Sequence, residues 1–162
     1  MITHKPDILK KQDATKLFDT VMDMKFAWHY FNGVNYLNDG YSQFYHMFWF
    51  NNQTLSPYLE EVRPLINCLD PLAIIKIKAN LLPKTETIVE HPFHQDYEDK
   101  RDYKTAIYYV NSNNGYTRFK EDIKVQSEAN KLILFDGPTD HASATCTDID
   151  RRVVININYF AK

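Results

Sequence analysis

Apolar residues recur at helical spacing twice in the first half of the chain. Residues 12–24 are predicted to form a helix with Asp13 as its N-cap. Its apolar stripe consists of Leu17, Phe18, Val21 and Met22. A second helix is predicted to begin at Ser56-Pro57, with Pro57 in its first turn, and to end at Asp70-Pro71. Its apolar face consists of Leu59, Val62, Leu65 and Ile66.

Between and after these helices the pattern changes to short, aromatic and β-branched runs. Residues 26–31 and 43–50 are predicted strands in the first part of the chain. From residue 73 onward, runs of this kind follow one another and are separated by turn residues. They cover 73–82, 87–93, 103–111, 116–120, 122–126, 131–135, 142–147 and 152–160. This succession predicts a mainly β fold with N-terminal helices, an antiparallel sandwich or jelly roll in which the helices cover one sheet.

The last predicted strand, 152–160, has two different faces. One face is apolar and consists of Val153, Ile155, Ile157 and Tyr159. The other, more polar face consists of Arg152, Val154, Asn156, Asn158 and Phe160. The apolar face requires cover, which the helices can supply. The polar face indicates either an outer sheet surface or the wall of a wet cavity.

Composition narrows the class of protein. With 162 residues, 44% of them hydrophobic and 25% charged, the chain fits one globular domain spanning 1–162. We expect residues 1–72 to support a jelly-roll core at 73–160. The net charge of −2 disfavours nucleic-acid binding, and two cysteines without zinc spacing favour reduced thiols in a cytoplasmic protein. No leader or membrane span is predicted. The oligomeric state cannot be read from the sequence.

The segment 91–96 carries the candidate chemistry. His94 and Asp96 are two residues apart, so an extended backbone projects both to one side. With a remote histidine, such a pair makes the two-histidine, one-carboxylate ligand set of non-haem Fe(II) oxygenases. His141 is the only histidine downstream, and it precedes a predicted strand. The alternatives are a chance H-x-D spacing and a loop histidine capped by Asp140, while His91 is interpreted as an exposed or structural residue.

Arg152 is the second candidate for chemistry. It opens the last strand on the polar face, where a guanidinium could bind a carboxylate through two parallel hydrogen bonds. Arg151 is the competing residue, but it falls on the apolar face and is interpreted as reaching solvent at the strand edge.

In this context the chain resembles a known family, the Fe(II)/2-oxoglutarate-dependent dioxygenases, and within it the prolyl-hydroxylase-like branch. His94-Gln95-Asp96 matches the H-x-D motif, and the strand 105–111 matches the one that follows it. The turn and strand 115–119, the approach to His141 and the closing strand 152–160 also match in order. Tyr116 departs from the family by replacing the second glycine of the usual turn. The resemblance covers roughly residues 73–160.

The resemblance implies a double-stranded β-helix, which is a jelly-roll, cupin-like barrel. It implies that His94, Asp96 and His141 bind Fe(II), that 2-oxoglutarate and O₂ are cosubstrates, and that Arg152 and Tyr109 hold the distal carboxylate of 2-oxoglutarate. Because Asp96 is present, hydroxylation is expected rather than halogenation. For Tyr109 the alternative is core packing with a satisfied hydroxyl. For the whole protein the alternative is a non-catalytic, cupin-like ligand- or partner-binding module.

The substrate is the least determined part. By resemblance, a prolyl residue of a peptide or protein is favoured, followed closely by a free amino acid or other small molecule. Asn156 and Asn158 are candidate substrate-facing residues on the polar face of the last strand. The charged segment 97–104 is interpreted either as a lid or as a solvated loop.

Overall fold

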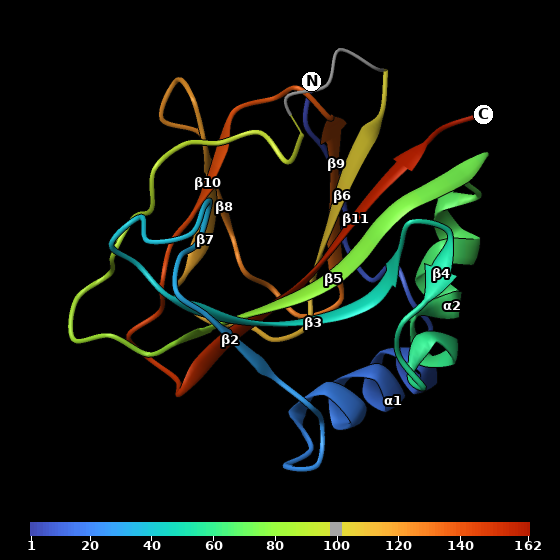
Figure 1. Cartoon of the computed structure of the whole chain (residues 1–162), viewed down its shortest axis with the longest axis horizontal. Coiled ribbons are helices and arrows are strands. Elements are labelled where there is room, and N and C mark those ends of the chain that lie inside the picture. Colours follow the sequence, from blue (N-terminus) through green and yellow to red (C-terminus); the bar gives the residue numbers. More distant parts are fainter. Residues whose placement is uncertain (98–101) are drawn as a thin grey trace.

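A computed structural model of the chain describes residues 1–97 and 102–162 (Figure 1). Two helices, α1 (Lys11–Met22) and α2 (Leu59–Leu69), accompany the strands. The strands of the first part are β1 (Thr3–Lys5), β2 (His29–Phe31), β3 (Gln43–Phe50), β4 (Gln53–Thr54) and β5 (Ala73–Pro83). Those of the second part are β6 (Lys104–Tyr109), β7 (Tyr116–Phe119), β8 (Lys124–Gln126), β9 (Lys131–Asp136), β10 (His141–Ser143) and β11 (Arg151–Phe160).

The larger of two antiparallel sheets runs in the order β1-β9-β6-β11-β5-β3-β2, with β4 attached to β3. Its centre is β11, which pairs with β5 on one side and with β6 on the other. The register places Asn156 opposite Lys78 of β5 and opposite Ile107 of β6. Strands from the first 72 residues therefore share one sheet with the strands of the second half.

The smaller sheet has the order β10-β7-β8 and packs across the larger one. Buried residues from both sheets meet between them in a small apolar cluster. This cluster consists of Ile107, Tyr109, Phe119, Val125, Ile133, Phe135 and Val154. The two sheets also enclose a cavity lined by β7 and β10 on one side and by β5, β6 and β11 on the other. This two-sheet arrangement is the jelly roll that the strand pattern predicted.

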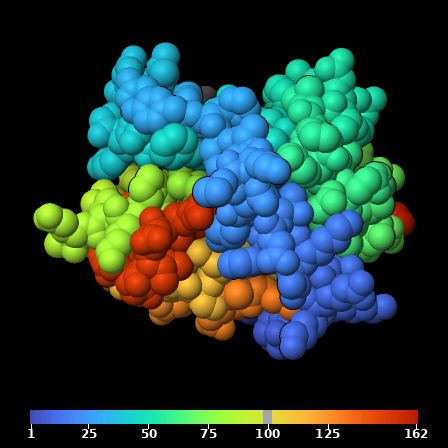
Figure 2. Space-filling model, turned by 90° about the horizontal axis from the view of Figure 1, so that it is seen from below, coloured from blue at the N-terminus to red at the C-terminus, as the bar shows by residue number. Residues whose placement is uncertain are grey.

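The two helices cover the opposite face of the larger sheet (Figure 1). Leu17 and Val21 of α1 and Val62 and Leu65 of α2 are fully buried in the main core. The same core contains Val153, Ile155, Ile157 and Tyr159, the predicted apolar face of the last strand. From this side, the blue N-terminal segment with α1 and the green segment with α2 form much of the surface (Figure 2). Within the described part of the chain, neither helix has the length and apolar character that crossing a bilayer requires.

Several local predictions differ from the structure. The N-cap of α1 is Lys10 rather than Asp13, which lies in the first turn, where its charge favours the helix dipole. The predicted strand 87–93 does not form; within it there is only an isolated bridge at Glu90, and a second bridge lies just beyond it at His94. Proline at position 92 lacks the N–H that a continuous ladder needs. β1 was not predicted, because its sequence Thr3-His4-Lys5 carries no apolar alternation.

Candidate active site

Backbone pairing brings His94 and His141 together across 47 positions of sequence. The two residues form an antiparallel bridge in which each N–H donates to the other's carbonyl, at 2.9 and 3.0 Å. Their imidazole rings lie side by side with centroids 4.5 Å apart. Because these bonds involve the main chain, the pairing of the two histidines depends on strand geometry rather than on flexible side chains.

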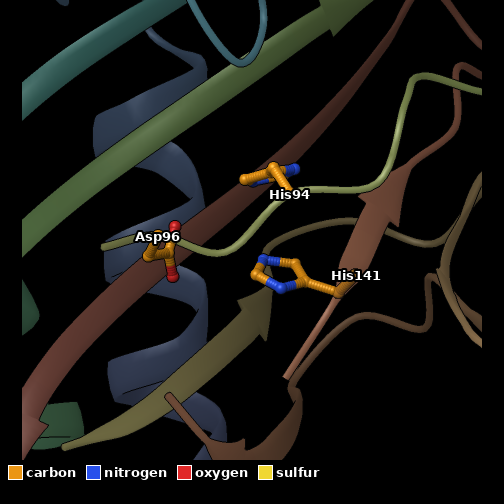
Figure 3. Close-up of side chains that lie close together, drawn as sticks. All are labelled: His94, Asp96 and His141. Atoms are coloured by element: carbon orange, nitrogen blue, oxygen red, sulfur yellow. The ribbon is translucent and has the colours of Figure 1, made fainter. Parts of the chain in front are cut away.

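Asp96 completes the group. One potential ligand atom from each of His94, Asp96 and His141 lies within 4.8 Å of the others. Figure 3 shows the three side chains converging, with His94 and Asp96 carried by one loop and His141 by the start of β10. The structure thus brings together the three residues that the sequence selected, and it leaves the buried His91 apart, held by Ser143 through a 2.8 Å hydrogen bond.

The ring nitrogens are arranged as metal ligands require. Nδ1 of His141 lies 3.0 Å from the carbonyl oxygen of Thr139, which can only accept, so Nδ1 carries a proton and Nε2 is the nitrogen that faces the other two residues. Nδ1 of His94 is buried and has no hydrogen-bond partner among the described residues. Burial, helped by neighbouring His141, lowers the pKa of His94 to about 4, so its imidazole is neutral near pH 7.

Asp96 is held by amide and hydroxyl donors from two strands. Nδ2 of Asn158 donates to Oδ2 of Asp96 at 2.8 Å, and Nδ2 of Asn156 donates to both carboxylate oxygens at 3.1 and 3.2 Å. Thr105 on β6 adds its hydroxyl at 3.3 Å. Burial alone would raise the pKa of Asp96, but His141, Lys76 and the Asn158 amide outweigh it and hold that pKa below its ordinary value. The carboxylate is therefore ionised and fixed in direction.

A fully buried arginine lies at the other end of the same cavity. Nε of Arg152 donates to the hydroxyl of Ser127 at 2.8 Å, and its Nη2 donates to the hydroxyl of Thr117 at 3.1 Å. The hydroxyl of Tyr109 donates to the same Thr117 oxygen at 2.9 Å, and the guanidinium lies 5.7 Å from the centre of the Tyr109 ring. Among the described residues, no carboxylate pairs with Arg152. Burying an unpaired cation is costly, so this position is prepared for an anion from outside the chain.

Gly115 makes room for Arg152. A Cβ at this position would lie 2.7 Å from Cδ of Arg152 and 2.8 Å from the carbonyl oxygen of Thr145. Such contacts are too short for carbon, so any side chain here would displace the arginine. The departure from the family turn at Tyr116 leaves this approach intact, because Tyr116 points away and donates its hydroxyl to Glu90.

Comparison with known proteins identifies the fold. No protein-family model matches the chain, and no curated protein matches it in sequence. Solved structures do match. A prolyl hydroxylase from Trichoplax adhaerens, in complex with a hypoxia inducible factor peptide, superposes with a TM-score of 0.70 at 14% identity, over 98% of this chain and 83% of that chain. A prolyl-4-hydroxylase from Pseudomonas putida gives a TM-score of 0.64 at 12% identity, over 99% and 92% of the two chains.

This chain has the fold of the Fe(II)/2-oxoglutarate oxygenases. A third match is the epimerase SnoN of nogalamycin biosynthesis in complex with Fe³⁺ and α-ketoglutarate, with a TM-score of 0.65 at 12% identity, over 99% and 78% of the two chains. The predicted double-stranded β-helix is thereby confirmed.

The cavity of this oxygenase fold contains side chains that the sequence did not single out. Thr117 is the clearest, since it joins Tyr109 to Arg152, and its place two residues after Gly115 on a short strand was the available signal. Lys78 and Asn80 of β5 also line the cavity, together with Gln43 of β3. Their lining positions follow from strand register, which sequence alone does not give. The segment proposed as a lid, 97–104, includes residues 98–101, which lie outside the described residues.

Asn158, on the polar face of β11, bonds to Asp96 and to Thr105. It is fully buried, and its amide reaches Asp96 and the hydroxyl of Thr105, at 2.8 and 3.0 Å. Asn156 is nearly as buried and lines the cavity while also bonding Asp96. The substrate-facing role proposed for both asparagines from the sequence stays a prediction.

Replacing Asn158 by leucine is expected to weaken divalent-metal binding by about 10- to 100-fold, as loss of a ligand's supporting hydrogen bond commonly does. Leucine keeps the volume but removes the amide that directs Asp96. Titration of the apo protein with Mn²⁺ or Co²⁺ would measure the affinity, and thermal unfolding would show that the variant is folded. Unchanged affinity in a folded N158L protein would mean that Asn158 does not position the carboxylate.

Proposed function

We propose that this chain is an Fe(II)- and 2-oxoglutarate-dependent dioxygenase that hydroxylates an unactivated C–H bond. The observation that carries the proposal is one cavity with a two-histidine, one-carboxylate donor set at one end and, at the other, a buried arginine that has no anionic partner among the described residues. The fold of the matching oxygenases supports it, and the closeness of prolyl hydroxylases among them supports a prolyl residue of a peptide, or a related small molecule, as substrate.

The donor set suits the metal. Two neutral imidazoles and one carboxylate on one side of an ion are the ligands of non-haem Fe(II) oxygenases, and they leave the remaining coordination positions open. His94, with its unpartnered Nδ1, His141 and Asp96 would hold the ion. The bound Fe(II), with 2-oxoglutarate and O₂, supplies the oxidising power for the C–H bond.

The cavity also suits the cosubstrate. Arg152 would bind the distal carboxylate of 2-oxoglutarate in a charge-assisted pair, and Ser127 and Thr117 fix its guanidinium through Nε and Nη2. Tyr109 would act through Thr117, because its hydroxyl is already donated to that residue and its side chain is fully buried. The apolar residues Ile107 and Val154, between the two ends, exclude water from the space between carboxylate and metal.

The first test is anaerobic mixing of the apo protein with Fe(II) and 2-oxoglutarate, followed by the visible spectrum. A weak charge-transfer band that needs all three components is expected, because the band requires 2-oxoglutarate bound to iron. Addition of O₂ should then convert 2-oxoglutarate to succinate. Absence of the band in a folded protein that still binds 2-oxoglutarate would favour the non-catalytic binding module.

A further inference from the structure

Lys78 is a cation on the cavity wall that the proposed reaction does not use. It lies in the middle of β5, directly opposite Asn156 of β11, and its half-buried side chain lines the cavity. Asn156 in turn donates to Asp96, so Lys78 stands one strand away from the candidate metal ligands. Arg152 lies four residues before Asn156 on the same strand β11, opposite Leu82 of β5.

This lysine has no bonded partner in the described part of the chain. It makes neither a hydrogen bond nor an ion pair there, and the opposite charge that acts on it is that of Asp96. Burial, with the like charge of Lys76, lowers the pKa of Lys78 to about 8, against the opposing attraction of Asp96. The ammonium is still mostly protonated at neutral pH, and it is poorly compensated.

Occupying the metal site makes that imbalance larger. In the proposed function the Asp96 charge is taken up by the metal, and the two carboxylates of 2-oxoglutarate are taken by the metal and by Arg152. Lys78 is then left beside a divalent cation without an anion of its own. A buried cation in this position is tolerable when a ligand supplies the opposite charge.

The side chains beside Lys78 indicate which further groups that ligand carries. Asn80 lies two residues along β5 on the same face and also lines the cavity, and its Oδ1 is buried without a hydrogen-bond partner in the described residues. Oδ1 of Asn156 is likewise buried and has no hydrogen-bond partner in the described residues. An unpaired amide oxygen requires an N–H or O–H donor. This side of the cavity therefore has the Lys78 ammonium to bind a carboxylate and, beside it, the amide oxygens of Asn80 and Asn156 to accept from an N–H group.

We propose that Lys78 binds a carboxylate of the primary substrate and that Asn80 accepts a hydrogen bond from an N–H of the same molecule. The substrate is then an amino or imino acid that keeps its carboxylate free, either as the free molecule or as the C-terminal residue of a peptide. This inference rests on the proposed function and narrows its substrate class, since an internal prolyl residue has neither a free carboxylate nor an N–H.

The experiment compares acids with their amides. The anaerobic protein loaded with Fe(II) and 2-oxoglutarate is titrated with free L-amino acids, including L-proline and L-alanine, and with Gly-Ala, each beside its carboxamide. Binding is followed by the change in the visible band, and succinate release is measured after O₂ is added. At least one acid is expected to bind the wild type more than about tenfold tighter than its amide, as expected for a desolvated charge pair. Comparison of L-alanine with Gly-Ala separates a free acid from a peptide terminus.

The variant Lys78→Met removes the charge and retains most of the side-chain length. It is expected to keep the 2-oxoglutarate band and to bind acid and amide equally, while Lys78→Arg restores part of the preference. Lys76→Met is the matched control, since Lys76 lies on the same face of β5 but places its Nζ over the Tyr97 ring, 4.7 Å from the centroid. This control should keep the preference for the acid.

Each other outcome overturns the proposal. Equal binding of acids and amides by the wild type, or no binding of either, would show that the protein does not recognise a substrate carboxylate. If K78M kept the full preference for acids over amides, Lys78 would not be the group that binds the carboxylate. A weakened 2-oxoglutarate band in that variant would show that Lys78 binds the cosubstrate instead. Failure of the proposed function looks different, because the wild type would then show no band before any substrate is added.

Discussion

Replacing Asp96 by alanine is expected to abolish both tight metal binding and turnover. Asp96 is the only carboxylate of the three-residue donor set, and it is ionised and aimed by Asn158, Asn156 and Thr105. Without it, two imidazoles alone would have to hold a divalent ion that prefers a mixed nitrogen and oxygen ligand set. The three donors that now face Asp96 would also lose their acceptor.

Metal titration and single-turnover succinate formation check this expectation, and together they separate loss of the ion from loss of chemistry. Asp136→Ala is a suitable control, because the Asp136 carboxylate is exposed and pairs with Lys104 at the surface. A folded D96A protein with wild-type affinity for Fe(II) and wild-type turnover would show that the three-residue group is not the metal site.

Replacing Arg152 by alanine is expected to weaken 2-oxoglutarate binding by well over tenfold, because losing one partner of a buried charge pair typically costs about 2–5 kcal/mol. Metal affinity should change much less, since Arg152 bonds Ser127 and Thr117 and none of the three donor residues. Anaerobic titration of the charge-transfer band with 2-oxoglutarate gives the apparent affinity directly.

Arg151→Ala is the matched control for this change. Arg151 is the adjacent residue, but its side chain lies on the helical face of the sheet near Phe18 and Met22, outside the cavity. Because alanine at position 152 leaves a large void, Arg152→Lys should be measured beside it; the lysine keeps the charge but loses the planar fork. Wild-type 2-oxoglutarate affinity in a folded R152A protein would assign the cosubstrate to another part of the chain.

Features with strong local patterns could be predicted from the sequence. Strand 43–50 was predicted with the bounds of β3, because its aromatic run has a clear strand composition between polar turns. The two faces of 152–160 were separated by alternation alone, and the core contains the four residues of the apolar face. His94, Asp96 and His141 were selected because residue type and spacing limited the choice.

The rest depended on contacts between distant segments. The amide of Asn158 reaches Asp96 across 62 positions, and Lys78 meets Asn156 only because β5 and β11 pair in one particular register. No local pattern encodes a register. The strand predicted at 87–93 failed for the opposite reason, since an attractive local composition was overruled by a proline and by the need to turn toward the cavity.

The short strand β7 has a consequence for how the two ligands of the proposed enzyme would bind. Through Thr117 it holds Arg152, and through the pairing of Phe119 with His141 it holds a residue of the metal donor set. Ordering β7 for one ligand therefore prepares it for the other. We expect the binding of metal and of 2-oxoglutarate to be thermodynamically linked, each raising the affinity for the other by the same factor. A strand of four residues would thus couple the two ligands of the site to each other.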